Sequence, residues 1–274
     1  MTSLHRRSVL RAASAAAAGA LAAGCATART DTASVRASGS PPPGGTGPPG
    51  PGARPSGPAV PDAARAARPP TRAPGLPVQI QHGPPRGNSV ALTFHGQGDA
   101  RTATALLGEA ERAGARVTVL AVGSWLDEQP LMARRILDGG HELGNHTQRH
   151  LDICALAEDA AYAEISGCAE RLRKLTGTIG SWFRPSRTQY ATTLVTRLAR
   201  RAGYPHVLSY DVDSLDADDP GAPAVQRTVL DRARPGSIVS LHLGHPGTVA
   251  ALPPILDGLH RRGLRAVTTT ELVT

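Results

Sequence analysis

From about residue 78 to the end of the chain, short apolar runs alternate with longer segments whose apolar residues lie three or four positions apart. The short runs are rich in β-branched residues and predict strands, whereas the longer segments predict helices. Glycine follows most of the helical segments, as is common at helix ends. The predicted strands are 90–94, 117–122, 141–145, 206–210, 237–241 and 266–268. The predicted helices lie around 106–113, 131–137, 157–175, 194–198, 225–233 and 255–259.

Such an alternation of strand and helix predicts successive βα units and a parallel sheet. Residues 78–274 form one domain, which is long enough to bury a core. About seven βα units in one domain favour a distorted, closed or nearly closed (β/α) barrel over an open sheet. The fold class is therefore expected to be α/β.

Polar side chains follow the predicted strands at the point where each strand ends. These residues are His95, His146, His150, Arg184, Asp211, Asp213, Asp216 and His242. Barrels of this kind place their chemistry at the carboxyl ends of the strands. We therefore expect these side chains to share one rim.

His146 and His150 lie four residues apart, just after a predicted strand. Neutral imidazole is a common metal ligand near physiological pH. On a helical turn, side chains at i and i+4 share one face, so both rings would reach one cation. The competing interpretation is two surface histidines that lie one turn apart.

The amino-terminal residues predict export rather than part of the fold. Arg6 and Arg7 precede an Ala-rich run over 12–23 that is too short to span a membrane, so 1–28 is interpreted as a signal peptide. The arginine pair resembles a twin-arginine signal. Residues 21–25 resemble a lipobox, with Ala22 where leucine is usual, and both lipidation of Cys25 and cleavage after Ala28 stay open. In either case the mature protein is expected outside the cytoplasm, either extracellular or anchored to the outer face of the cytoplasmic membrane.

Residues 29–77 are mostly Pro, Gly, Ala, Ser and Arg, and are interpreted as a disordered linker. Nine arginines and two aspartates precede residue 78, so this region holds seven of the eight net positive charges. The remaining domain is nearly neutral, which argues against a nucleic-acid partner. A membrane is expected to be involved only through a lipid on Cys25, and the domain is expected to be a monomer. Cys154 and Cys168 are interpreted either as a disulfide or as separate thiols.

Two segments resemble motifs of the polysaccharide deacetylase family, carbohydrate esterase family 4. They are 140–150, GHELGNHTQRH, and 236–242, GSIVSLH, and the end of the chain from Thr248 to Leu272 also fits. The resemblance implies a distorted (β/α) barrel and a divalent metal, commonly zinc. It also implies a hydrolase of carbon–nitrogen bonds other than peptide bonds, which removes N- or O-acetyl groups from polysaccharides. The expected substrate is an N-acetylated cell-wall or chitin-like polymer, with peptidoglycan the nearest.

The same resemblance implies roles for individual residues. His146 and His150 match the metal-binding histidines of the family, and Arg184 matches the arginine that orients the catalytic carboxylate. His242 matches the histidine that acts as general acid on the leaving amine. Asp213 or Asp216 would be the carboxylate that tunes His242.

The first motif departs from the family pattern. The family has Thr-Phe-Asp-Asp-Gly, with the first Asp as base and the second as metal ligand. Here His95 takes the base position and Gly96 the ligand position, and the next carboxylate is Asp99. Strand alternation places His95 on the same face as Thr93, toward the site.

Three interpretations follow from this departure. In the first, His95 is a third metal ligand and Asp99 is the base. In the second, glycines at 96 and 98 let the loop fold back, so that Asp99 is the ligand and His95 takes the proton. In the third, catalysis has been lost, and the chain is an inactive glycan-binding lipoprotein that keeps the fold.

Other candidates carry weaker signals. His245 is interpreted as a loop histidine that faces solvent, although it lies close to His242 in sequence. Trp125 and Trp182 would either stack on sugar rings or pack in the core.

Overall fold

The computed structural model describes residues 69–71 and 74–274, which lie within one compact unit, Ser56–Thr274. The expected signal peptide (1–28), Cys25 and most of the expected linker (29–77) lie outside the described residues. Leu76, near the end of that linker range, packs on the apolar core. No helix in this part of the chain has both the length and the apolar character needed to cross a membrane.

The strands are short and the helices between them are longer. The strands are β1 (Gln79–Ile80), β2 (Ser89–Gly96), β3 (Thr118–Ala121), β4 (Glu142–Asn145), β5 (Val207–Leu208), β6 (Val212–Asp213), β7 (Ile238–His242) and β8 (Arg265–Val267). The helices are α2 (Ala100–Arg112), α3 (Gly123–Glu128), α4 (Leu131–Asp138), α5 (Glu158–Thr176), α6 (Thr193–Arg201), α7 (Ala222–Arg232), α8 (Pro246–Arg261) and α9 (Thr269–Val273), with a 3-10 turn, η1 (Asp216–Asp218).

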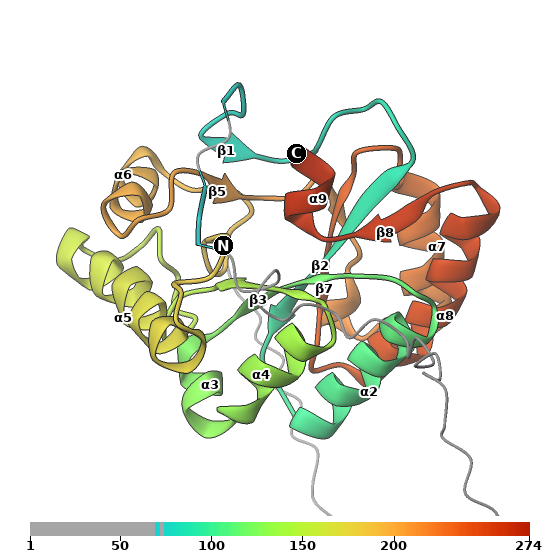
Figure 1. Ribbon diagram of the computed structural model, residues 1–274, viewed down its shortest axis with the longest axis horizontal. Coiled ribbons are helices and arrows are strands. Elements are labelled where there is room, and N and C mark those ends of the chain that lie inside the picture. The colour runs from blue at the N-terminus through green and yellow to red at the C-terminus, as the bar shows by residue number, and fades with distance from the viewer. Residues whose placement is uncertain (1–68, 72–73) are drawn as a thin grey trace, which may run out of the picture. The chain divides into compact units, whose positions relative to one another are not determined.

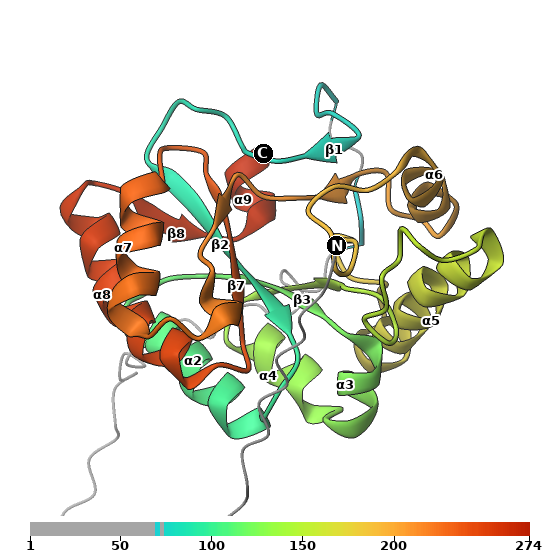
Figure 2. The ribbon, with the colours of Figure 1, turned by 180° about the vertical axis from the view of Figure 1, so that it is seen from behind.

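All of the paired strands run parallel, as predicted. One sheet has the order β4-β3-β2-β7-β6, with β8 against the first half of β2, and β1 pairs with β5. Single parallel bridges on either side of Phe183 join β4 to β5, and an antiparallel bridge joins His82 to Ser237. The helices lie around the strands in both views of the ribbon (Figures 1 and 2). The expected α/β fold with a parallel sheet is confirmed.

Strand β2 lies at the centre of the sheet, and apolar residues cover both of its faces. Val90, Leu92 and Phe94 pack with residues of the surrounding helices, while Ala91 packs with a separate cluster that includes Leu120. Near-continuous burial is typical of strands in a parallel sheet that is covered on both faces. Since β3 and β7 flank the second half of β2, residues at its carboxyl end lie beside residues of both neighbours.

Most predicted elements are confirmed, and the misses are short. Elements of two to six residues, namely β1, α3, β6, η1 and α9, give too few positions for a period to be recognised. Helix α8 begins at Pro246, well before the predicted stripe, because it continues through Pro253 and Pro254. Proline inside a helix removes a backbone donor, so it is normally taken as a helix boundary.

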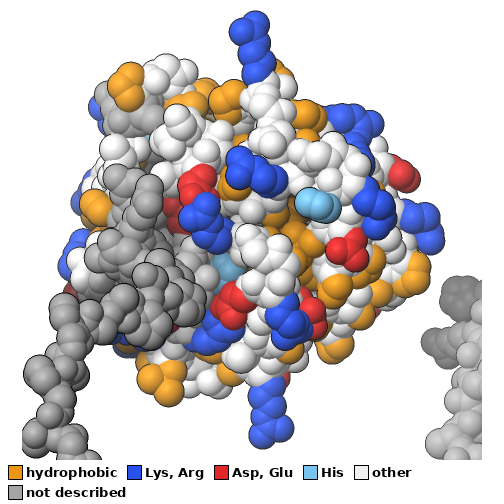
Figure 3. Space-filling model, turned by 45° about the vertical axis from the view of Figure 1, so that its right-hand side comes forward, with side chains coloured by type: hydrophobic (Ala, Val, Ile, Leu, Met, Phe, Trp, Pro, Cys, Tyr) orange, Lys and Arg blue, Asp and Glu red, His pale blue; other side chains and the backbone are white. Residues whose placement is uncertain are grey.

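Acidic and basic side chains are interspersed on the face shown in Figure 3, with hydrophobic side chains between them. This distribution agrees with the near-neutral charge of residues 78–274.

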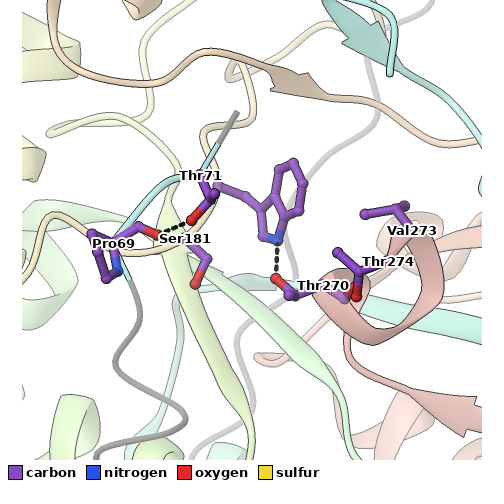
Figure 4. A pocket seen from close by; sticks show the side chains of 7 residues that line it. Pro69, Thr71, Ser181, Thr270, Val273 and Thr274 are labelled. Carbon is purple, nitrogen blue, oxygen red and sulfur yellow. Dashed lines mark hydrogen bonds between the residues drawn. The ribbon is translucent and has the colours of Figure 1, made fainter. Parts of the chain in front are cut away.

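The two tryptophans belong to the core. Trp125 and Trp182 are each 5% exposed, and their indole nitrogens donate to the Gly98 carbonyl and to the Thr270 hydroxyl. Neither face is therefore free to stack on a sugar. A cavity of about 110 Å³ lies beside Trp182, between Pro69 and Thr71 on one side and helix α9 on the other (Figure 4). None of its lining residues is a histidine.

Helix α9 is attached to the amino end of the sheet through a buried carboxyl group. Glu142, the first residue of β4, accepts hydrogen bonds from the Thr118 and Thr270 hydroxyls and from the Thr270 backbone N–H. Burial raises the pKa of Glu142, and the threonine hydrogen bonds act against that rise. The C-terminus therefore lies at the amino end of the strands.

The two described cysteines are separate thiols. Cys168 is buried, and its thiol donates to the Ala121 carbonyl, while the half-buried Cys154 lies 3.8 Å from the Tyr190 carbonyl oxygen. Burial raises the pKa of Cys168 to about 12. Because the thiolate is the reactive form, Cys168 should be inert in the folded protein.

We expect iodoacetamide at pH 8 to label Cys154 in the native protein but to leave Cys168 unlabelled until denaturant is added. Peptide mass spectrometry measures both sites, and Cys154→Ser serves as the control that assigns the label. A peptide disulfide between residues 154 and 168 would contradict the separation of the two thiols.

Candidate functional site

The centre of the site is the ladder between β2 and β7. Its register places His95 opposite His242, and the two ring centroids lie 4.4 Å apart. Thr93, on the same face of β2, donates its hydroxyl hydrogen to the Val239 carbonyl at 2.6 Å. His146 follows β4 directly, and its ring lies 4.3 Å from that of His95. Three strand ends thus bring three imidazoles together, as the sequence predicted.

His150 joins this group from a loop. The prediction that His146 and His150 share a helical turn is wrong, because Thr147 and His150 adopt left-handed backbone conformations with φ of 68° and 57°. The Nε2 atoms of the two histidines nevertheless lie 3.1 Å apart. The loop thus brings the two ring nitrogens together without a helical turn.

The left-handed conformation costs roughly 1–2 kcal/mol at each of Thr147 and His150, and hydrogen bonds hold the loop in it. The Asn145 side-chain oxygen accepts from the Thr147 N–H, and the Thr147 hydroxyl accepts from the His150 N–H. The buried carboxylate of Glu164 binds both the backbone and the guanidinium of Arg149. These supports were not predicted from the sequence. Asn145 and Thr147 are visible inside the histidine motif, whereas Glu164 gives no signal because it lies mid-helix on α5.

The histidines are prepared to bind a cation. The Nδ1 atom of His146 lies 3.0 Å from the Arg184 carbonyl, which only accepts, so Nδ1 carries the hydrogen and Nε2 keeps its lone pair. Burial, followed by neighbouring charged groups, places the pKa of His95 and of His146 well below the ordinary value. Burial and then Arg187 lower the pKa of His150. These shifts favour the neutral form of all three rings, which is the form that binds a metal.

One nitrogen from each of His95, His146 and His150 lies within 4.8 Å of the other two. Tetrahedral zinc binds nitrogen at about 2.0–2.1 Å, which places two ligand atoms roughly 3.3 Å apart. The 3.1 Å between His146 and His150 is close to that spacing. These residues therefore fit a divalent cation with three nitrogen ligands and one position left for water.

Asp99 is not among these residues. Its carboxylate caps helix α2 by accepting from the Thr102 N–H at 2.9 Å, and its side chain is exposed. The hydrogen bond from the Thr102 backbone lowers the pKa of Asp99. In this position the Asp99 carboxylate is placed neither as the base nor as a metal ligand.

Gly96 leaves no room for the family's second carboxylate. A Cβ atom at this position would lie 2.8 Å from Val119 Cγ1 and 2.9 Å from Ala121 Cα, both on strand β3. Strand β3 fills the space on the Cβ side of Gly96. Of residues 95 and 96, only His95 therefore has a side chain that can face the site.

His242 is held by a buried carboxylate. Asp216 accepts from the Nδ1 of His242 at 2.7 Å and from its backbone N–H at 2.8 Å, and Thr248 donates to the same carboxylate. Burial acts to raise the pKa of Asp216, but the hydrogen bonds from His242 and Thr248 hold it below its ordinary value. Of the two carboxylates considered for His242, Asp216 contacts it. The Asp213 carboxylate instead accepts from the Leu215 N–H.

Arg184 is fully buried, with one unused donor. Its Nε and Nη2 atoms donate to the carbonyls of Leu208 and Ser209, whereas Nη1 has no hydrogen-bond partner among the described residues. Burial lowers the pKa of Arg184 to about 9. Arg184 acts on the pKa of His95, and the Asp213 carboxylate acts on the pKa of Arg184, but no carboxylate among the described residues is hydrogen-bonded to the guanidinium.

Asp211 does not share the rim, contrary to the sequence prediction. Its carboxylate accepts from the Ile238 N–H at the first residue of β7, at the opposite end of that strand from His242.

We expect His146→Ala or His150→Ala to weaken zinc binding at least about 100-fold, because losing even the outer partners of ligands costs 10- to 100-fold. Isothermal titration and elemental analysis measure the affinity and the stoichiometry. The control is His260→Ala, which removes an exposed histidine from helix α8. Full-affinity binding of one ion by either ligand variant would contradict the assignment.

Gly96→Ala should lower the free energy of unfolding by about 1–3 kcal/mol, because the added methyl group overlaps β3. Gly96→Asp should cost at least as much. Urea unfolding measures both variants. Gly108→Ala is the matched control, since its Cβ would meet only Arg112 Nη1, at 3.5 Å. If Gly96→Ala is as stable as the control, β3 is not closed against this position.

Comparison with known proteins supports the resemblance found in the sequence. The polysaccharide deacetylase family model matches residues 82–207. A peptidoglycan-N-acetylglucosamine deacetylase of Bacillus cereus is 31% identical over 188 residues, covering 67% of this chain and 87% of the relative.

Solved structures share the fold. A peptidoglycan N-acetylglucosamine deacetylase in complex with 4-naphthalen-1-yl-N-oxidanyl-benzamide superposes with a TM-score of 0.67 at 26% identity, covering 72% of this chain and 92% of the other. A CE4 family pseudoenzyme from Bacillus anthracis gives 0.68 at 23% identity, covering 73% and 70%. The second likeness concerns the fold alone. From the family model and the sequence identity together, the chain belongs to the polysaccharide deacetylase family, the hydrolases of carbohydrate esterase family 4.

Proposed function

We propose that this protein is an exported, metal-dependent hydrolase that removes N- or O-acetyl groups from an extracellular polysaccharide, with peptidoglycan the leading candidate. The observation that carries the proposal is the three-imidazole cluster beside the hydrogen-bonded pair of His242 and Asp216. The catalytic domain is a distorted (β/α) barrel over 78–274, and the cation is zinc.

His95, His146 and His150 would hold the cation, which would polarise the acetyl carbonyl and lower the pKa of a bound water. Zinc is favoured over magnesium and calcium because all three donors are imidazole nitrogens rather than oxygens. We favour His95 as third ligand, since Asp99 already caps helix α2.

The first motif lacks its base, so another group must accept a proton from the attacking water. No carboxylate of the described residues belongs to the histidine cluster. His242 lies next to His95. The Nδ1 atom of His242 is hydrogen-bonded to Asp216, so its Nε2 atom is left to exchange a proton with the substrate. We assign both proton transfers to this imidazole: it takes the proton from water and gives it to the departing amine.

Export, tethering and anchoring are proposed from the sequence. The signal over 1–28 and the linker over 29–77 would deliver the domain outside the cytoplasm, and Cys25 would carry the lipid if the lipobox is used. Oligomerisation is not required, since every residue of the proposed site comes from one chain.

The competing proposal is a catalytically silent glycan-binding lipoprotein. The altered first motif favours it. Against it stands the His242–Asp216–Thr248 arrangement, which a protein that only binds glycans does not need.

We expect the zinc-loaded protein to release acetate from N-acetylated chitooligosaccharides or from peptidoglycan, and expect chelation to stop the release. His242→Gln should lower kcat at least about 100-fold, because a positioned proton carrier contributes that much. Zinc affinity should be retained. Acetate assays and zinc titration of the same samples separate the two effects, and His260→Ala is the control.

Glycan binding without acetate release from any acetylated substrate, at full zinc loading, would favour the silent binder. Full activity of His242→Gln would contradict the role assigned to this imidazole.

A further inference from the structure

A second imidazole–carboxylate pair lies next to the first. The Nδ1 of His245 is 2.7 Å from the Asp219 carboxylate, the same distance that separates His242 from Asp216. The rings of His242 and His245 meet edge to face, with centroids 5.6 Å apart. The row of imidazoles that begins at the metal ligands thus extends outward by one more ring.

Both pairs join the same two segments of chain. The carboxylates come from η1 and the residue that follows it, whereas the histidines come from the end of β7 and the residue that caps α8. In each pair the histidine follows its aspartate by 26 residues. His245 is partly exposed, as expected of a loop histidine, but a carboxylate also holds its ring.

Asp219 has a left-handed backbone conformation. Its φ of 49° is one of five positive values among the described non-glycine residues, and the other four are at Thr147, His150, Arg187 and Leu215. All five lie in the loops that carry the histidine cluster, Arg184 and Asp216. Left-handed non-glycine residues often cluster at functional sites.

The exposure of the second pair differs from that of the first. The side chain of Asp216 is 1% exposed and that of His242 is 17%, but Asp219 is 67% exposed and His245 is 27%. His245 and Asp219 also belong to no three-residue group with metal-ligand spacing among the described residues. The second pair is therefore placed to meet a ligand that arrives from solvent, and a metal ion is not the ligand that it fits.

We propose that His245, oriented by Asp219, binds a hydroxyl group of the glycan chain close to the group that His242 addresses. Asp219 occupies Nδ1, so Nε2 is left to accept from or donate to a hydroxyl, which is able to play either part. The ring centroids of His242 and His245 lie 5.6 Å apart, so a glycan that reaches His242 also lies close to His245. The choice of ligand rests on the proposed function, while the geometry of the pair does not.

The test is the affinity for tetra-N-acetylchitotetraose, measured by isothermal titration with and without zinc. His245→Ala should weaken binding about three- to tenfold, the loss expected for one hydrogen bond. Where turnover is measurable, KM for the tetrasaccharide should rise by the same factor with a smaller change in kcat. The selectivity for the tetrasaccharide over 4-nitrophenyl acetate, which has no sugar, should fall accordingly.

Asp219→Ala should weaken binding in the same direction, and the double variant should be no worse than His245→Ala, because Asp219 acts through His245. His245→Asn keeps a polar group and should recover part of the affinity. His260→Ala, at the far end of the same helix, is the matched control. Thermal unfolding of each variant confirms that it is folded.

Unchanged tetrasaccharide affinity in folded His245→Ala would overturn the proposal, as would a loss confined to kcat or an absence of measurable saccharide binding. The proposed function is judged separately by acetate release. Release with no effect of His245 refutes only this inference, whereas binding that depends on His245 without release refutes only the hydrolase.

Discussion

The pairing of β2 with β7 is the contact on which the site depends. It fixes His95 against His242, and through β3 and β4 it also fixes the position of His146. Because parallel strands end at a common edge, residues far apart in sequence reach one place without a long-range contact of their own. The apolar burial on both faces of β2 keeps this register from slipping, since a shift by one residue would turn His95 into the core.

The change from carboxylate to imidazole in the first motif alters the charge balance of the site. A cation held by one carboxylate and two histidines keeps part of its charge neutralised, whereas three neutral imidazoles leave it whole. The buried guanidinium of Arg184 adds a further positive charge nearby, and no carboxylate forms an ion pair with it among the described residues. Such a field stabilises negative charge that develops on an acetyl oxygen. It also opposes the entry of the cation itself, so the two effects act against each other in this protein.

The sequence predicted much of this arrangement, and its failures have physical causes. The strand and helix periods located β2, β3, β4 and β7, and the polar residues after them located the histidines and Asp216. The path of the loop to His150 was not predictable, because left-handed residues and a buried Glu164 leave no periodic trace. The roles considered for Asp99 failed, and the carboxylate partner of His245 was missed, for a related reason: whether a polar loop residue caps a helix, pairs with a neighbour or contacts a ligand depends on tertiary neighbours.

The amino and carboxyl ends of the strands carry different parts of the chain. The first described residues, Pro69 and Thr71, line the same cavity as Thr270 and Thr274, where α9 is attached to the amino end of β4 through Glu142. The histidines lie at the carboxyl ends of the same strands. The chain thus enters the domain on the side opposite to its chemistry. The first described residues therefore stay clear of the end of the domain at which a polymer would meet the histidines.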